Sequence, residues 1–136
     1  MATQDKIIAG AMLIHGSFGT LWTLWAACQT GFPPMFVAAN LALAAVGVAA
    51  GIGWFMQRRW SIYLGIAFFL TQLVHIFTPT FQWSFTLGFN LTISLGWINT
   101  GEFGLNLFAL AMLLWVRARA FAPNNSAGDF PITPDT

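Results

Sequence analysis

More than a third of the chain runs without a charged side chain, because no Asp, Glu, Lys or Arg lies between Lys6 and Arg58. Only 7% of all 136 residues are charged and 57% are hydrophobic, whereas an ordinary soluble domain carries roughly 25% charged residues. Such a chain cannot cover a soluble fold with polar groups, and it is too apolar to stay disordered. Its net charge of +1 also argues against a nucleic-acid binder. The sequence therefore predicts a protein that lies in a lipid bilayer.

Apolar segments separated by helix breakers predict an all-α integral membrane fold with four transmembrane helices. Each spanning helix needs roughly 20 mainly apolar residues. The first is expected to be retained, because no small-residue cleavage pattern of a signal peptide follows it. The prolines and polar residues of 120–136 predict a disordered cytoplasmic tail after a single domain over 1–119. The expected spans are 7–27, 35–56, 60–77 and 100–116.

The basic residues predict the topology of this bundle. With four spans, every Lys and Arg falls on one side, and the opposite loops, 28–34 and 78–99, contain none. The positive-inside rule then places both termini in the cytoplasm of a bacterial-type inner (plasma) membrane. The residues concerned are Lys6, Arg58, Arg59, Arg117 and Arg119.

Apolar and polar residues alternate strictly from Phe81 to Trp97. A period of two is typical of a strand, and a lone strand cannot remain in lipid with its backbone groups unpaired. The pattern therefore predicts an extracytoplasmic extended segment over 81–97, formed as a β-hairpin that turns around 88–90. An irregular interfacial loop and a helical extension of the last span are the alternatives.

The aromatic face of this segment needs cover, and its strand edge invites pairing with another chain. The cover could come from membrane lipids, the helix ends, other membrane subunits or a homo-oligomer. The expected partner contacts are Phe81, Trp83, Phe85, Phe89 and Trp97.

Polar residues at membrane depth are functional candidates. His75 and Glu102 are expected at a similar level near the outer face, which would allow a ligand or proton site together with Asn40, Gln72 and Asn106. The structural alternative for Glu102 is a capping box with Asn99 as N-cap. For His75 it is an interfacial histidine, and for the amides it is hydrogen bonding between helices.

His15 lies deeper, among small residues that would leave room for a flat macrocycle. The Ala11-x-x-x-His15 spacing is similar to that of bacterial light-harvesting helices, which would imply a haem or chlorophyll-type pigment ligand. His15 and His75 differ by roughly 9 Å in depth, which argues against one haem held between them. The alternative is a packed, hydrogen-bonded histidine.

Few other motifs carry chemistry. Gly47-x-x-x-Gly51 predicts close helix packing, within the bundle or between copies. Cys28 is the only cysteine, so no intrachain disulfide or cysteine-based metal site is expected, and we predict no metal centre.

These features favour a small accessory or structural subunit of a larger inner-membrane complex, without enzymatic activity, that contacts partners through apolar helix faces and the 81–97 segment. The alternative is a homo-oligomeric transporter or channel that uses Glu102, His75 and Asn40. A second alternative is a membrane enzyme that acts on a lipid or quinone, with His75 and Glu102 as acid and base.

Overall fold

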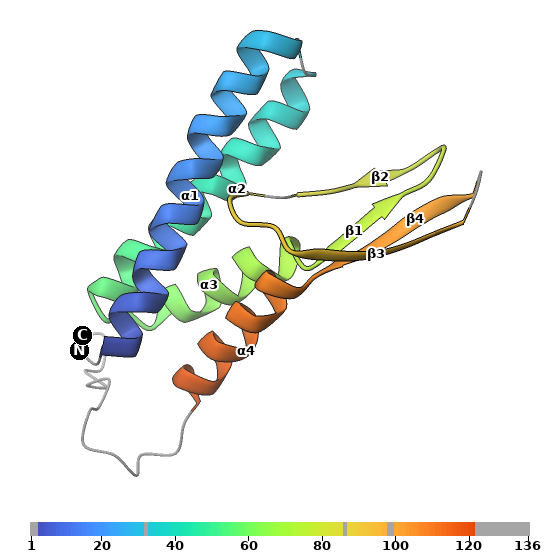
Figure 1. Cartoon of the computed structure of the whole chain (residues 1–136). Helices are drawn as coiled ribbons and strands as arrows, with labels where there is room; N and C mark the ends of the chain where they lie inside the picture. The colour runs from blue at the N-terminus through green and yellow to red at the C-terminus, as the bar shows by residue number, and fades with distance from the viewer. Residues whose placement is uncertain (1–2, 32, 86, 98–99, 122–136) are drawn as a thin grey trace.

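The computed structural model describes residues 3–31, 33–85, 87–97 and 100–121. The chain is mainly helical and carries one small sheet, so the expectation of a largely helical fold is confirmed (Figure 1). The helices are α1 (Thr3–Thr30), α2 (Pro34–Phe55), α3 (Trp60–Thr71) and α4 (Leu107–Ala120). The strands are β1 (Val74–Phe77), β2 (Gln82–Trp83), β3 (Thr92–Trp97) and β4 (Gly101–Asn106).

The two N-terminal helices form a long antiparallel hairpin, and both are long and apolar enough to cross a membrane. Prolines set the turn between them, since Pro34 opens α2 at a position where its missing N–H has no helical partner. The backbones approach closely at Gly16, where an added Cβ would lie 2.8 Å from the Ala44 carbonyl oxygen and from the Val48 nitrogen. Small residues at this contact let α1 and α2 pack along each other.

The shorter helices α3 and α4 pack at the lower end of this hairpin (Figure 1). Glycines again provide the room: the Phe68 ring lies against Gly47, and the Met12 side chain lies against Gly65. The shared core contains the following fully or almost fully buried side chains: Ile8, Met12, Trp54, Phe68, Phe69, Met112 and Val116.

The expected continuous helices over 60–77 and 100–116 are wrong at their outer ends. Helix α3 stops at Thr71 and the chain continues as β1, while the fourth segment begins as β4 and becomes helical only at Leu107. β-branched and aromatic residues favour a strand in β1, and Gly101 and Gly104 weaken a helix over β4. The structure thus contains two helices of spanning length and does not confirm a four-span bundle.

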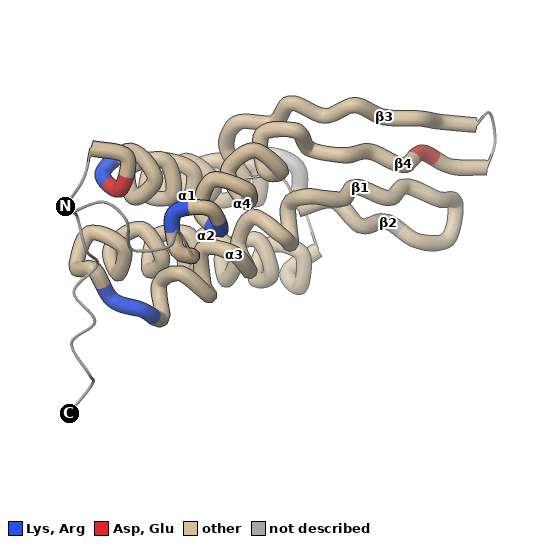
Figure 2. The backbone as a smooth tube through the Cα atoms, turned by 90° about the horizontal axis from the view of Figure 1, so that it is seen from below, with Lys and Arg blue, Asp and Glu red and all other residues tan. Residues whose placement is uncertain are grey.

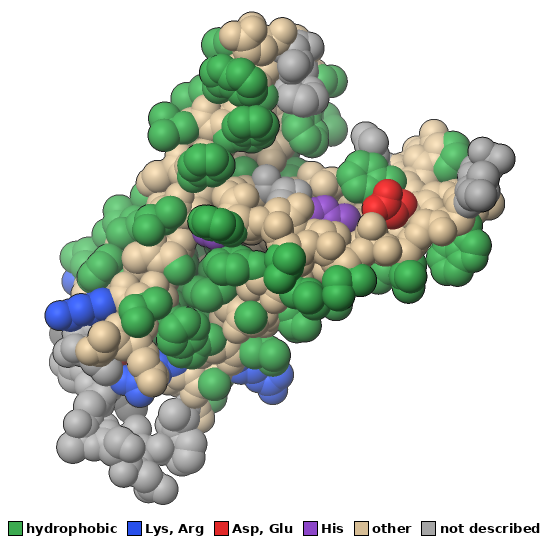
Figure 3. Space-filling model, in the orientation of Figure 1, with side chains coloured by type: hydrophobic (Ala, Val, Ile, Leu, Met, Phe, Trp, Pro, Cys, Tyr) green, Lys and Arg blue, Asp and Glu red, His purple; other side chains and the backbone are tan. Residues whose placement is uncertain are grey.

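The four strands form one antiparallel sheet in the order β2-β1-β4-β3. β1 pairs with β2, β3 pairs with β4, and the two hairpins join through β1 and β4. The predicted hairpin within 81–97 is therefore wrong in its pairing, because β2 and β3 lie at opposite edges of the sheet. The sheet projects sideways from the helices, so that the molecule has the outline of a V (Figures 1 and 3).

The sheet has two different faces, which follow from the register of its strands. His75 in β1 lies opposite Gly104, and Ser94 in β3 also lies opposite Gly104, so these residues share one polar face with Glu102. The other face is apolar and points away from the α1–α2 hairpin. We call it the apolar sheet face; its residues are Val74, Ile76, Trp83, Ile93, Leu95, Trp97, Phe103 and Leu105.

The basic residues gather at the end of the molecule away from the sheet (Figure 2). There the buried Asp5 carboxylate of α1 accepts two hydrogen bonds from the Arg119 guanidinium in the last turn of α4, at 2.7 and 3.2 Å. This bidentate ion pair ties the start of the first helix to the end of the last.

Candidate functional site

His15 holds the segment that connects β2 and β3. Its Nε2 accepts the Phe89 backbone N–H at 3.0 Å, and the Phe108 ring stacks on the imidazole with centroids 4.8 Å apart. Gly88, with φ +78°, lies so close that an added Cβ would be 2.8 Å from the ring. The nitrogen that would bind a macrocycle metal is engaged, so His15 does not fit a haem or pigment ligand.

Gln72, the C-cap of α3, holds the same segment. Its Oε1 accepts the Leu87 N–H at 3.1 Å, while its Nε2 donates to the Phe68 carbonyl oxygen. The Leu87 side chain is buried against Gly19 of α1. His15 and Gln72 therefore pair the backbone of residues 87–89 where no sheet partner exists.

The predicted capping role belongs to a different residue. Asn106 is the N-cap of α4, where its side-chain oxygen accepts the N–H groups of Phe108 and Ala109. Glu102 lies in β4, four residues before that cap and exposed on the polar sheet face. The capping box at Glu102 is therefore wrong, and Asn99 lies outside the described residues. The helix begins late because Gly101 and Gly104 disfavour a helix, while the alternation of polar and apolar residues favours a strand up to Asn106.

His75 contacts Ser84, which is not among the candidate site residues predicted from the sequence. Its Nδ1 lies 3.0 Å from the Ser84 hydroxyl oxygen, and the β1–β2 pairing brings these residues together. The His75 side chain is buried, and its Nε2 has no hydrogen-bond partner among the described residues. Glu102 lies diagonally across on the same face of the neighbouring strand.

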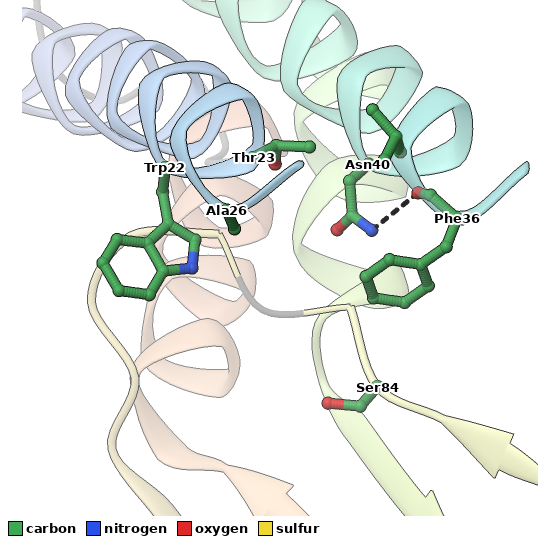
Figure 4. Close-up of a pocket in the computed structure, with 7 residues that line it drawn as sticks. Trp22, Thr23, Ala26, Phe36, Asn40 and Ser84 are labelled. Atoms are coloured by element: carbon green, nitrogen blue, oxygen red, sulfur yellow. Dashed lines mark hydrogen bonds between the residues drawn. The ribbon is translucent and has the colours of Figure 1, made fainter. Parts of the chain in front are cut away.

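Ser84 also lines a pocket of about 260 Å³ near the turn that joins α1 and α2. Figure 4 shows Trp22, Thr23 and Ala26 entering it from α1, and Phe36 and Asn40 from α2. Val37 completes the lining. The Asn40 Nδ2 donates to the Phe36 carbonyl oxygen at 2.9 Å.

The structure thus divides the expected polar cluster. Ser84 links His75 to the pocket that contains Asn40, whereas Gln72 and Asn106 serve the connecting segment and the α4 cap. Gly47 and Gly51 pack inside the chain, against Phe68 of α3 and Leu13 of α1. Within the described ranges, no three His, Cys, Asp or Glu side chains are grouped closely enough to hold a metal ion.

The titration of His75 should be visible in the stability of the protein. Burial lowers the pKa of its imidazole below the ordinary value of 6.5, and the Glu102 carboxylate offsets part of this effect. The unfolded chain then binds this proton more readily, so the free energy of unfolding falls as the pH drops below about 6.5. Thermal unfolding in detergent between about pH 8 and pH 5 measures this loss.

His75→Asn is the matched variant, because it removes the titrating group and keeps a polar side chain of similar size. His15 is present in both proteins, so the difference between their pH profiles of thermal unfolding reports the titration of His75 alone. Identical profiles would contradict the assignment.

The aromatic residues expected to contact a partner are mostly accessible. Phe81, Phe89 and Trp97 are exposed, Trp83 is 38% exposed, and Phe85 is half-buried. The neighbouring edge strand β3 exposes Ile93, Leu95 and Trp97 by 60 to 71%. An apolar surface of this kind on a sheet edge is the second candidate site of the molecule.

Comparison with known proteins finds no matching family model, no matching curated protein and no matching solved structure. Function is therefore inferred from the geometry of the chain itself.

Proposed function

We propose that this protein is a small, non-catalytic subunit of a membrane assembly, which docks on another membrane chain through the apolar sheet face and the edge strand β3. The observation that carries the proposal is a sheet that exposes large apolar side chains on one face and ends in a six-residue edge strand. Sheet edges of this length are usually covered or paired in stable proteins.

The sheet needs a partner in either environment. In water, the exposed Leu95, Trp97 and Phe103 side chains would form an apolar patch typical of interaction sites. In lipid, those side chains would be satisfied, but the outer backbone groups of β3 would lack hydrogen bonds, at a cost of several kcal/mol each. A partner chain that adds a strand to β3 meets both requirements.

Helices α1 and α2 support membrane insertion, and we infer that both remain in the mature protein. The close approach at Gly16 and the ion pair of Asp5 with Arg119 make α1 part of the fold. Removal of α1 as a signal sequence would expose the core and leave Arg119 without its carboxylate partner. The gathering of basic residues at one end favours a cytoplasmic location for that end.

Photo-crosslinking in native membranes tests the docking. A photoreactive side chain at Leu95 is expected to give adducts to a protein chain, and the mass of the adduct distinguishes a second copy from another subunit. The same group at the adjacent Ser94, on the opposite sheet face, should give fewer such adducts. Adducts to lipid alone from both positions would contradict the proposal.

A further inference from the structure

The pocket of Figure 4 has a polar floor between two aromatic side chains. Thr23 and Asn40 are 7% and 5% exposed and lie on facing helices, while Trp22 and Phe36 form the sides. Thr23 lies 20 residues along α1 from its start, or about 30 Å at 1.5 Å per residue. In the proposed orientation the pocket lies near the outer membrane interface, where a lipid-soluble molecule carries its head.

Both floor residues keep hydrogen-bonding capacity that the described part of the chain does not use. The hydroxyls of Thr20 and Thr71 donate to the carbonyl oxygen four residues earlier, whereas Thr23 makes no such bond to a described residue. The Asn40 amide donates to Phe36, and its Oδ1 accepts nothing from the described residues. Both side chains line the pocket, so these oxygens can form hydrogen bonds with a molecule that occupies it.

The residues that line the pocket indicate what kind of molecule it can bind. It contains no charged side chain, so a charged head would lose its hydration without compensation. Hydroxyl and amide groups both donate and accept, so they suit carbonyl and hydroxyl oxygens alike. The Trp22 and Phe36 rings suit a flat ring. The volume of about 260 Å³ lies just below the roughly 300–1,000 Å³ of sites for whole ligands, so it suits a head whose chain extends into lipid.

We propose that this pocket binds the uncharged ring of a lipid-soluble quinone or quinol through Thr23, Asn40 and Ser84. The Ser84 hydroxyl lines the same pocket and lies at hydrogen-bond distance from His75 Nδ1. The Thr23 hydroxyl and the Asn40 amide suit both the carbonyl and the hydroxyl form of the ring. The proposal concerns binding, and it is independent of docking at the sheet.

Equilibrium binding of decylubiquinone to the purified chain in nanodiscs tests the site. Thr23→Val and Ser84→Ala are each expected to raise the dissociation constant roughly threefold to tenfold, the effect of one lost hydrogen bond. Thr20→Val is the matched control, because this hydroxyl lies on the same helix, bonds to Gly16 and does not line the pocket. It should bind as the wild type does. Thermal unfolding of each variant identifies any loss of binding that is due to misfolding.

Dioctanoylglycerol separates a ring-specific site from a general lipid site, because it offers similar oxygens without a ring. It is expected to compete weakly with the quinone. Competition as strong as that of unlabelled quinone would overturn the ring assignment. Quinone binding that none of the pocket substitutions changes would show only partition into lipid, and it would overturn the site.

Discussion

Leu95→Lys is expected to weaken assembly by about tenfold to one hundredfold while the chain itself stays folded. The Leu95 side chain is 67% exposed, so a lysine there adds no strain to the isolated protein. In the assembly, the substitution would remove a buried leucine that contributes about 1.5–3 kcal/mol, and each 1.4 kcal/mol corresponds to a factor of ten. The measurement is the fraction of protein in the larger species, by size and native mass in mild detergent at several concentrations.

Ser94→Lys is the control for this experiment. It introduces the same charge one residue away in β3, on the opposite face of the sheet. It should leave the assembly largely intact. Equal losses from both variants would mean that charge near the edge, rather than the apolar sheet face, controls association. A wild-type chain that remains a monomer without any partner would contradict docking altogether.

Gly16→Ala and Gly10→Ala are expected to change the stability in opposite directions. A Cβ at Gly16 would lie 2.8 Å from two backbone atoms of α2, which cannot move without separating the helices. Overpacking of this kind costs about 1–3 kcal/mol. At Gly10 of the same helix, a Cβ would meet nothing within 4 Å. Here alanine should stabilise the chain by up to about 1 kcal/mol, because it has the higher helix propensity.

Thermal unfolding of the two variants in the same detergent provides the measurement. Because both substitutions replace glycine by alanine within α1, their helix-propensity contributions cancel in the difference. The remaining difference reports the contact between α1 and α2. A Gly16→Ala protein as stable as the Gly10→Ala protein would contradict this close approach.

The sequence predicts the two long helices well, because each coincides with a long run of mainly apolar residues. Helices α1 and α2 contain 28 and 22 residues. Apolar stretches of this length predict helices, because strands are usually much shorter. The third and fourth segments mislead, because a short apolar run has the same composition in a buried strand and in a helix. Helix α3 stops after Thr71, yet the sequence remains mainly apolar through β1 (Val74–Phe77).

The alternation over 81–97 identifies extended chain but does not identify its partner. A period of two assigns each residue to a face and leaves open which strand lies alongside. The predicted turn near Gly88 is instead a segment that folds onto His15 and Gln72. The glycine was a correct sign of an unusual backbone, since its φ is positive, whereas the pairing depends on contacts distant in sequence.

The candidate pocket could be anticipated only in part. Asn40 stands out as a polar residue inside an apolar helix, and it does line the pocket. Ser84 is one of several similar polar positions in the alternating segment, so nothing local distinguishes it. Its contact with His75 arises from the register of β1 and β2, and Thr23 meets Asn40 only through the packing of α1 on α2. Such proximities follow from tertiary structure.

Asn106 ends a strand and caps the helix that follows directly after it. A helix advances about 1.5 Å per residue and a strand about 3.3 Å. The six residues of β4 and the 14 of α4 can therefore extend about 41 Å, nearly as far as the 28 residues of α1, at about 42 Å. The β4–α4 segment and α1 can therefore reach similar lengths, although they contain different numbers of residues. If the helix began one residue earlier or later, the combined length of β4 and α4 would change by about 1.8 Å. The position of Asn106 therefore determines how far this segment extends.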